Sequence, residues 1–503
     1  MLYHYFVGIN RDEHKSVYND FGFSEAIAQD TASLSYIIEP IPGLQVISMD
    51  VCRYDSNYIA NYPQTDGGFE PNVLQWVKDR ILDATGQGKI IIGMMHHNLI
   101  QHFTNQKMIF GQYVIDDWDN VSNQLAALGL KVVFTGHFHA QDMVSKTTPS
   151  GKQIFDIETG SVVTGPCPYR ICHLQTNLSL VITGKRVEEI NYDTGTLTFQ
   201  QYALQDLQTG LPPTIIFLLT NPPYNISKSM AETVEHAFTE TMIAHYYGNE
   251  GNPSSNSQWI MFLLNISGYG YITQALQSVW NDLAPDDWNT TTSLTPSGTQ
   301  LLLDLKAYLQ GPFHGSAMNI DLNPGLMPLH QPYNQEPWLY TGSDGVSSIP
   351  PDAVDWVLVE LRDAAGASQA GSSAKVARQA AWVMSNGNIR AMDGSSLLKF
   401  YHTPVSQMFP VVYHRNHLPL MSANPIILSG GIYPYDFSSG AGQVFGNTEG
   451  TVEMVTGIWG MIAGDSNTDG TVDNIDKNIW NSEAGSHGYL ESDFNLSGNT
   501  DNP

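Results

Sequence analysis

Two short apolar runs along the chain each lead directly into histidine. The runs cover residues 90–95 and 132–135, and neither alternates between apolar and polar positions. Strands that are buried on both faces show this pattern. A helical stripe of apolar residues precedes each run; the first stripe follows Pro71, a favourable first helical residue, and the second ends at Gly129. The pattern predicts helix, strand and histidine twice in succession, as in an α/β sheet.

The chain has 503 residues, which is long enough for several domains. The same pattern divides it into four segments. In chain order we expect an α/β segment over 1–205, a helical extension or cap over 206–295, an all-β sandwich module over 296–460 and a tail over 464–503.

Three further expectations concern the junctions between these segments. Short strands are predicted over 187–191 and 196–202, where turn residues separate apolar runs. Residues 289–298 are rich in Thr and Ser, as linkers often are. From Leu301 onward, strand-like runs separated by Gly, Pro, Ser and Asn predict the β-sandwich. These runs are LLLDLKAYLQ, DWVLVELRD, VARQAAWVM, LKFYHT, FPVVYHR and GIYPYDF.

His96, His137 and His139 are candidate metal ligands. His137 and His139 stand two residues apart at a predicted strand end, so both rings can point the same way, and Gly136 permits a tight turn before them. Ligands of open α/β sheets bind beyond the carboxyl ends of the strands, so we expect the three histidines to form one cluster. Neutral imidazole suits zinc, iron and manganese ions.

These residues also carry a family resemblance. GHFH at 136–139 resembles the G-H-x-H signature of calcineurin-like metallophosphoesterases, and MMHHN at 94–98 resembles the strand-end histidine motif that precedes it. Over residues 1–205 the resemblance implies a two-sheet α/β sandwich of metallophosphoesterase type. It implies two divalent transition metal ions (Fe, Zn or Mn) held by His96, His137 and His139, with His97 the weaker candidate. The implied reaction is hydrolysis of a phosphomonoester or phosphodiester by a metal-activated water.

Three earlier motifs of that family, D-x-H, G-D and G-N-H-D/E, have no clear counterpart here. Asp12-Glu13-His14 has the first spacing but follows no strand-like run, and Gly464-Asp465 is the one Gly-Asp pair. Residues 17–35 resemble the family's segment just after the third motif. We therefore expect a fragment of a longer protein, clipped at both ends and with little activity alone.

Arg170 closes a segment, 159–170, that we expect to line the same cleft. Its guanidinium matches the geometry of phosphate oxygens, which makes it a candidate substrate-binding residue; a surface salt bridge is the alternative. Cys167 and Cys172 admit either a small-loop disulfide or two unbonded thiols.

Residues 465–476, DSNTDGTVDNID, have the pattern of a twelve-residue calcium loop. Gly470 stands at the turn position, and Asp rather than Glu stands at the last position. This variant resembles dockerin repeats, and a second, incomplete copy runs from Asp493 to Asp501. The resemblance implies Ca²⁺ as the ligand and a cohesin-like partner. The candidate calcium ligands are Asp465, Asn467, Asp469, Thr471, Asp473 and Asp476.

The composition limits the partners and the location. A net charge of −27 argues against nucleic-acid partners, and no apolar run is long enough to span a membrane. Only 14% of residues are charged, which is more typical of a secreted or surface protein than of a cytosolic one. Met1–Asn10 lacks the basic start and long apolar core of a signal peptide. The segment from 296 resembles a C-terminal β module of large secreted Bacteroidetes-type proteins, so we expect an extracellular or cell-surface location. The alternative to a phosphoesterase is a non-catalytic surface protein, an adhesin or scaffold, with a calcium-binding tail.

Overall fold

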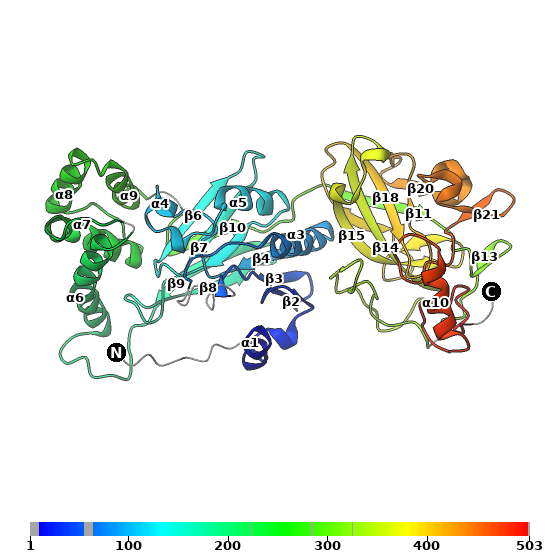
Figure 1. Ribbon diagram of the computed structural model, residues 1–503, viewed down its shortest axis with the longest axis horizontal. Coiled ribbons are helices and arrows are strands. Elements are labelled where there is room, and N and C mark those ends of the chain that lie inside the picture. The colour runs from blue at the N-terminus through cyan, green and yellow to red at the C-terminus, as the bar shows by residue number, and fades with distance from the viewer. Residues whose placement is uncertain (1–9, 55–63, 223, 283–284, 324, 501–503) are drawn as a thin grey trace. The chain divides into compact units, whose positions relative to one another are not determined.

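The computed structural model describes residues 10–54, 64–222, 224–282, 285–323 and 325–500 (Figure 1). The chain divides into two compact units. The first comprises Met1–Lys78 and Ile91–Thr295, and the second comprises Asp79–Ile90 and Pro296–Pro503. The first unit is mixed α/β and the second is rich in strands, which confirms the expected layout at this level.

A seven-stranded sheet forms the centre of the first unit. Its order is β1-β2-β3-β4-β5-β7-β6; β4, β5 and β7 run parallel to one another, and β6 is antiparallel to β7. The carboxyl ends of β4 and β5 therefore meet at one edge of the sheet. The strands are β1 (Ala28–Gln29), β2 (Tyr36–Ile41), β3 (Leu44–Ser48), β4 (Ile90–Met94), β5 (Val132–Thr135), β6 (Asp142–Thr147) and β7 (Gln153–Glu158).

The predicted helix–strand pairs are present. Helix α3 (Pro71–Gly86) precedes β4 and buries Val77 and Ile81 completely. Helix α5 (Trp118–Ala127) precedes β5, and Gly129 follows it with a φ of 104°, the left-handed conformation that ends helices. The short α1 (Arg11–Val17) and α4 (Gln106–Ile109) complete this part of the unit. Asp12-Glu13-His14 lies inside α1, so its D-x-H spacing does not mark a strand end.

A small antiparallel sheet corrects the predicted linker. Its order is β10-β9-β8, formed by β8 (Pro168–Leu174), β9 (Ser179–Arg186) and β10 (Asn289–Ser293). β10 pairs with β9 from Asn289 opposite Thr183 to Ser293 opposite Ser179. The Thr-rich stretch is thus an edge strand, because β-branched Thr also fits a half-exposed strand. All three cysteines are free, so Cys167 and Cys172 form no disulfide.

Helices occupy 199–280 and confirm the helical nature of that stretch. They are α6 (Phe199–Thr220), α7 (Lys228–Tyr247), α8 (Ser255–Ile266) and α9 (Gly270–Trp280). The strand predicted over 196–202 is wrong: Thr198 accepts a hydrogen bond from the Gln201 amide, and this capping box starts α6. The strand predicted over 187–191 is also wrong, since these residues form no regular element.

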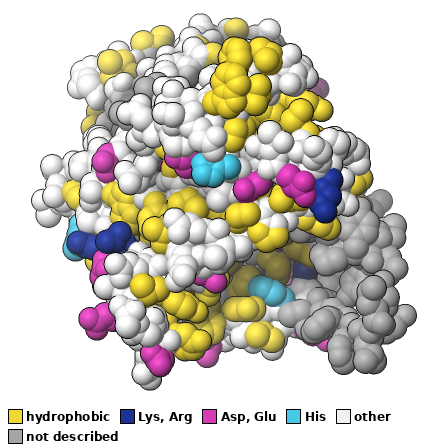
Figure 2. Space-filling view, turned by 90° about the vertical axis from the view of Figure 1, so that its left-hand side faces the viewer, with side chains coloured by type: hydrophobic (Ala, Val, Ile, Leu, Met, Phe, Trp, Pro, Cys, Tyr) yellow, Lys and Arg dark blue, Asp and Glu magenta, His cyan; other side chains and the backbone are white. Residues whose placement is uncertain are grey.

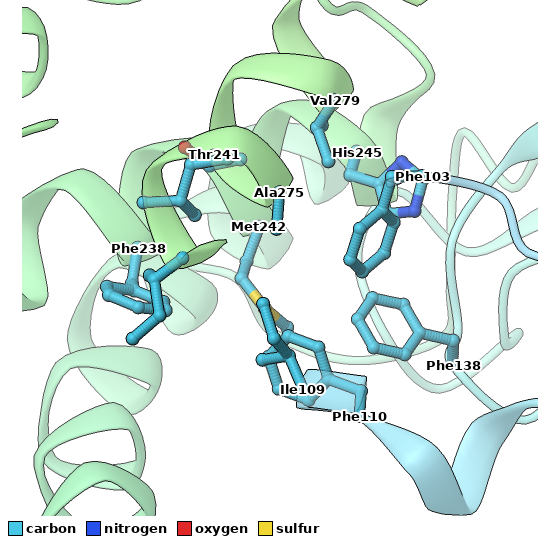
Figure 3. Close-up of a pocket in the computed structure, with 12 residues that line it drawn as sticks. Phe103, Ile109, Phe110, Phe138, Phe238, Thr241, Met242, His245, Ala275 and Val279 are labelled. Carbon is cyan, nitrogen blue, oxygen red and sulfur yellow. The ribbon is translucent and has the colours of Figure 1, made fainter. Parts of the chain in front are cut away.

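Apolar side chains of these helices pack in one cluster with Phe103, Ile109 and Phe138 (Figure 3). Other apolar side chains of the helices are exposed, and hydrophobic side chains form several separate patches in the space-filling view (Figure 2). Trp259 and Phe262 stack on one another at the surface of α8, with ring centroids 5.4 Å apart. No helix within the described ranges is both long and apolar enough to cross a membrane.

An eight-stranded sheet forms the core of the second unit. Its order is β17-β11-β16-β15-β14-β18-β19, and β20 pairs with β11. Each of the six strand-like runs predicted from Leu301 onward overlaps one of these strands. The strands are β11 (Gln300–Lys306), β14 (Ala353–Ala364), β15 (Lys375–Met384), β16 (Asn388–Arg390), β17 (Leu398–Tyr401), β18 (Gln407–Tyr413), β19 (Leu420–Met421) and β20 (Tyr433–Asp436).

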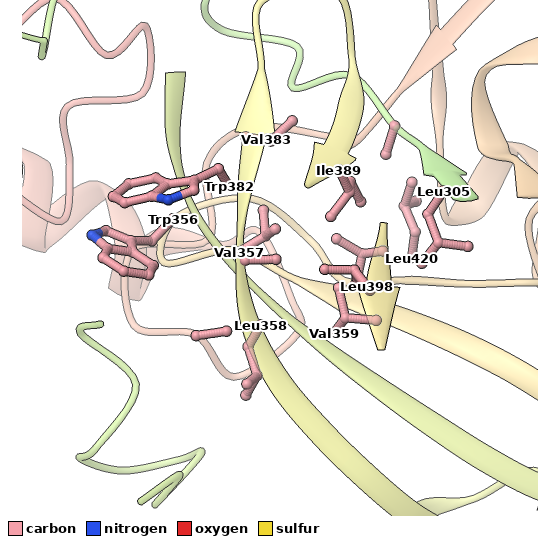
Figure 4. Packing of buried hydrophobic residues seen from close by; sticks show 14 of the residues in the cluster. Leu305, Trp356, Val357, Leu358, Val359, Trp382, Val383, Ile389, Leu398 and Leu420 are labelled. Atoms are coloured by element: carbon pink, nitrogen blue, oxygen red, sulfur yellow. The ribbon is translucent and has the colours of Figure 1, made fainter. Parts of the chain in front are cut away.

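The central strands β14 and β15 contribute many of the buried side chains of this core (Figure 4). Trp356 and Trp382 are fully buried, with ring centroids 3.8 Å apart. Two small hairpins, β12 (Phe313–His314) with β13 (Ala317–Met318) and β21 (Val452–Val455) with β22 (Ile458–Gly460), and helix α10 (Asn474–Glu483) belong to the same unit.

Candidate metal-binding sites

Histidine side chains gather where β4 and β5 end. The ring centroids of His96 and His137 lie 4.5 Å apart, and the His97 ring lies 4.6 Å from His137 and 5.4 Å from His96. His139 follows at the same turn, and its Nδ1 lies 3.1 Å from Thr164 Oγ1. The structure thus brings the rings of His96 and His137 together and adds His97, which the sequence ranked lower, while the printed contact of the His139 ring is with Thr164.

The GHFH turn has an unusual backbone. His137 and His139 adopt φ angles of 76° and 67°, a region that non-glycine residues rarely occupy. The Gly136 amide donates to the His96 carbonyl oxygen at 3.0 Å, which ties the turn to the end of β4. Between the two histidines, Phe138 is buried against Phe103 (Figure 3). Strained residues persist where the surroundings hold them, and such strain clusters at functional sites.

The environment keeps these imidazoles neutral. Burial is the main cause that lowers the pKa of His137 to about 4, and the neighbouring His97 and His96 add to it. Burial also lowers the pKa values of His96, His97 and His139. Neutral imidazole is the form that coordinates a metal ion. His97 Nδ1 is buried without a hydrogen-bond partner, while Nε2 of His97 and of His137 lie 2.9 and 3.1 Å from the Thr65 carbonyl oxygen.

Neutral imidazole is the kind of ligand that a transition metal ion prefers. As the rings lie in this structure, however, no three of these histidines bring ligand atoms within 4.8 Å of one another. Among the described residues, the side chains of Asp142, Asp282 and Asp287 do bring three ligand atoms within 4.8 Å of one another. This group includes no histidine.

A hollow of about 490 Å³ opens beside His96. Asp50, just after β3, lines the same hollow and is one carboxylate on this side of the cluster. Its oxygens accept hydrogen bonds from the Leu34 and Cys52 amides and from Tyr54 Oη, so its position is fixed by its own neighbourhood. Both oxygens of Asp50 are thus used within the protein, and among the described residues Asp50 forms no group of three close ligand atoms with the histidines.

Arg170 is placed differently from the prediction of a residue open to substrate. Its guanidinium donates to the carbonyl oxygens of Asp287 at 2.7 Å and Glu158 at 2.5 Å, and its Nε donates to Thr159 Oγ1 at 3.1 Å. These donors are used within the protein, so Arg170 joins the end of β7 to the segment before β10.

Sequence reasoning missed a buried polar network just beyond GHFH. Glu158 Oε1 accepts a hydrogen bond from the Ala140 amide and Oε2 accepts one from Asn98 Nδ2. Burial raises the pKa of Glu158 to about 7. His102 Nδ1 lies 3.0 Å from Asp142 Oδ2. Acidic residues at the end of a buried strand, as in FDIETG at 155–160, were the available signal.

The tail forms the predicted loop at 465–476. Gly470 adopts a φ of 84°, and its amide donates to Asp465 Oδ2 at 3.2 Å. Asp476 is buried at the start of α10 and accepts the amides of Asn467 and Asp473. Asp465 Oδ1 is buried without a hydrogen-bond partner. Burial, with the charges of Asp476 and Asp469, raises the pKa of Asp465 to about 6.

The remaining predicted ligands also lie in this loop. Asn467 Oδ1 accepts the Asp469 amide and Asp469 Oδ1 accepts the Thr471 amide, at 3.1 and 2.9 Å. Asp473 caps α10. Side-chain oxygens at alternate positions thus accept hydrogen bonds from the loop's own amides.

The second copy repeats the first. The Gly498 amide donates to Asp493 Oδ2 at 2.8 Å, as the Gly470 amide does to Asp465. Asn416 joins the two loops, because its carbonyl oxygen accepts from the Asp465 amide and its Nδ2 donates to the Asp493 carbonyl oxygen. Asp501, the last residue predicted for this copy, lies outside the described residues.

No protein-family model matches the chain, and no curated protein shows significant similarity to it. The case for a function therefore rests on the geometry of these sites.

Proposed function

We propose that the first unit carries a transition-metal site of a metal-dependent phosphoesterase, and that its substrate is a phosphomonoester or phosphodiester. The observation that supports this most is the gathering of neutral histidines at the ends of two parallel strands, with His137 and His139 in left-handed conformations. The resemblance of GHFH and MMHHN to metallophosphoesterase motifs gives the reaction class.

The residues of the chain have separate roles in this proposal. His96, His137 and His139 would hold the ion, which when bound lowers the pKa of a bound water and polarises a phosphoryl oxygen. Phe138, packed against Phe103, fixes the turn that presents the two histidines beside it. The Thr65 carbonyl oxygen, 3.1 Å from His137 Nε2, limits the orientations of that ring.

The tail favours a second candidate function. The unpartnered Oδ1 of Asp465 and the repeated loop support calcium binding at 465–476, with the dockerin-like role of docking on a cohesin-like partner. A secreted or cell-surface adhesin or scaffold needs this tail and does not need a working phosphoesterase centre. The two functions differ in whether the metal-loaded histidine cluster binds a phosphate group.

Orthovanadate, an analogue of phosphate, separates them. With Mn²⁺ or Zn²⁺ present, we expect calorimetry on the full chain to show vanadate binding that disappears when the metal is chelated. His137→Ala should weaken vanadate binding by about tenfold or more, because a ligand is lost. The control is His173→Ala, an exposed histidine on β8. No vanadate binding by the metal-loaded chain, or equal binding by both variants, would favour the adhesin or scaffold.

A further inference from the structure

Three carboxylates converge in the first unit outside the histidine cluster. Asp142 begins β6, Asp282 follows α9 and Asp287 precedes β10. One oxygen of each lies within 4.8 Å of the others. Like charges this close repel strongly unless something neutralises them.

Asp142 has one buried oxygen that a bound cation, or a proton shared with Asp287, would satisfy. Its side chain is almost completely buried, and its Oδ2 lies 3.0 Å from His102 Nδ1. Its other oxygen, Oδ1, is buried and accepts no hydrogen bond. A buried carboxylate oxygen without a partner is costly, and buried charges are normally paired or coordinate metals.

The group is open to solvent on one side. A hollow of about 370 Å³ is lined by Glu250, Asp282, Asp286 and Asp287 and by the backbone from Gly248 to Gly251. A cation could enter through this hollow and keep several waters as ligands. The acidic lining would attract it.

Two buried imidazoles, those of His102 and His245, lie beside Asp142 and are shared with Asp156 and Glu250. Burial disfavours protonation of His102 and His245, but Asp142 and Asp156 raise the pKa of His102, and Glu250 and Asp142 raise that of His245.

These two imidazoles are thus engaged with Asp142, Asp156 and Glu250. Neither of them is paired with the carboxylate of Asp287. Arg170 donates to the carbonyl oxygen of Asp287 and not to its carboxylate. Burial, followed by the charges of Asp142 and Glu250, raises the pKa of Asp287, as expected for a carboxylate that lacks a counter-charge.

We propose that Asp142, Asp282 and Asp287 bind a divalent cation of the oxygen-ligand class, with Ca²⁺ as the best fit. Only oxygen ligands are offered, and the hollow leaves room for the six to eight ligands in flexible geometry that Ca²⁺ accepts, whereas Mg²⁺ demands a near-ideal octahedron. The ion fastens the helices of 199–280 to the start of β6, three residues after His139. This site does not depend on the phosphoesterase proposal.

The test must first remove the tail loops, which we also expect to bind calcium. The full chain carrying Asp465→Ala and Asp493→Ala is the background. Tb³⁺, a luminescent substitute for Ca²⁺, is the probe, and Trp288 is its sensitiser, since its Nε1 donates to the carbonyl oxygens of Tyr247 and Gly248 beside the group. We expect sensitised emission that Ca²⁺ displaces.

Two variants of this background remove a ligand, and a third is the matched control. Asp287→Asn and the more exposed Asp282→Asn should each weaken binding by about tenfold or more, because charge count sets calcium affinity. Asp286→Asn removes an equal charge from the same hollow but not from the group of three. It should bind like the background, and its Oδ1 can still accept from the Trp288 and Asn289 amides.

Thermal unfolding gives an independent readout. Ca²⁺ should raise the melting temperature of the background and of Asp286→Asn, but not that of Asp287→Asn or Asp282→Asn. The proposal is overturned if the background shows no sensitised emission, or if all three variants lose affinity alike. It is also overturned if Asp287→Asn stabilises a background that binds no ion, because the carboxylates would then share a proton instead.

Discussion

At the scale of single residues, Asp355 shows how the second unit holds a buried charge. Its side chain is fully buried, and its Oδ2 accepts from Arg415 Nε at 2.9 Å and lies 3.3 Å from His414 Nε2. Its Oδ1 accepts from Tyr489 Oη at 2.6 Å and from the Trp356 amide at 2.7 Å. One carboxylate therefore joins β14, the turn after β18 and the chain that leads into the second loop of the tail.

We expect Asp355→Asn to lower the free energy of unfolding of the second unit by about 3 kcal/mol, since it leaves the buried Arg415 charge without its counter-ion. Urea unfolding of the full chain measures this. Asp352→Asn, an exposed aspartate three residues earlier, is the matched control and should change stability little. Equal losses in the two variants would show that the Asp355–Arg415 pair is not important for stability.

The same carboxylate predicts a loss of stability in acid. Burial opposes ionisation, but Arg415 and then His414 lower the pKa of Asp355 to about 2. Because the folded-state pKa lies below the unfolded value, the stabilisation is present above about pH 4 and is lost as the pH falls toward about 2. It amounts to about 2 kcal/mol. Urea unfolding across this range should show a steeper loss in the wild type than in Asp355→Asn; parallel curves would contradict the assignment.

At the scale of elements, the loop at 465–476 and α10 form one unit of structure. Asp473 and Asp476 of the loop cap α10, so an ion bound by the loop would share these side chains with the start of the helix.

Asp465→Ala should lower the number of calcium ions bound by the full chain by one, because the loop loses the ligand whose Oδ1 has no protein partner. Calorimetry measures the stoichiometry. Asp321→Ala, an exposed aspartate elsewhere in the second unit, should leave it unchanged. An unchanged stoichiometry in Asp465→Ala would contradict the proposal that this loop binds calcium.

Elements that bury both faces were predictable from the sequence, and elements at an edge were not. β4, β5 and the helices before them follow from continuous apolar runs and helical stripes. β10 has the composition of a linker, and its partner β9 precedes it by about a hundred residues, so its pairing with β9 has no local signal.

The sites divide in the same way. The proximity of His96 and His137 was predictable because each follows a recognisable strand, and the loop at 465–476 was predictable because its residues are local; calcium binding by this loop stays a prediction. The carboxylate group was not, because Asp142, Asp282 and Asp287 come from three separate segments and only folding brings them together.

At the scale of the whole molecule, the negative net charge limits which ligands the protein can attract. The chain carries 22 Lys and Arg against 49 Asp and Glu, a net charge of −27. A phosphate ester is an anion and is repelled by such a protein unless bound cations reverse the local potential. The phosphoesterase proposal thus requires metal for substrate binding as well as for chemistry.

We expect the purified 503-residue chain to hydrolyse bis(4-nitrophenyl) phosphate little faster than buffer, even with Mn²⁺ or Zn²⁺ added. The described histidines do not bring three ligand atoms within 4.8 Å of one another, and no carboxylate completes such a group with them. Release of nitrophenol measures the rate. Robust turnover that is lost in His137→Ala and kept in His173→Ala would show that the present residues already form a complete centre.

The most direct test of the account is anomalous diffraction from a crystal of the chain grown with Zn²⁺ or Mn²⁺. The central claim is that the histidines at the ends of β4 and β5 bind a transition metal ion. We predict an anomalous peak within coordinating distance, about 2 Å, of ring nitrogens of His96 and His137. No peak at the cluster, with the rings placed as they are here and metal bound elsewhere, would contradict the claim.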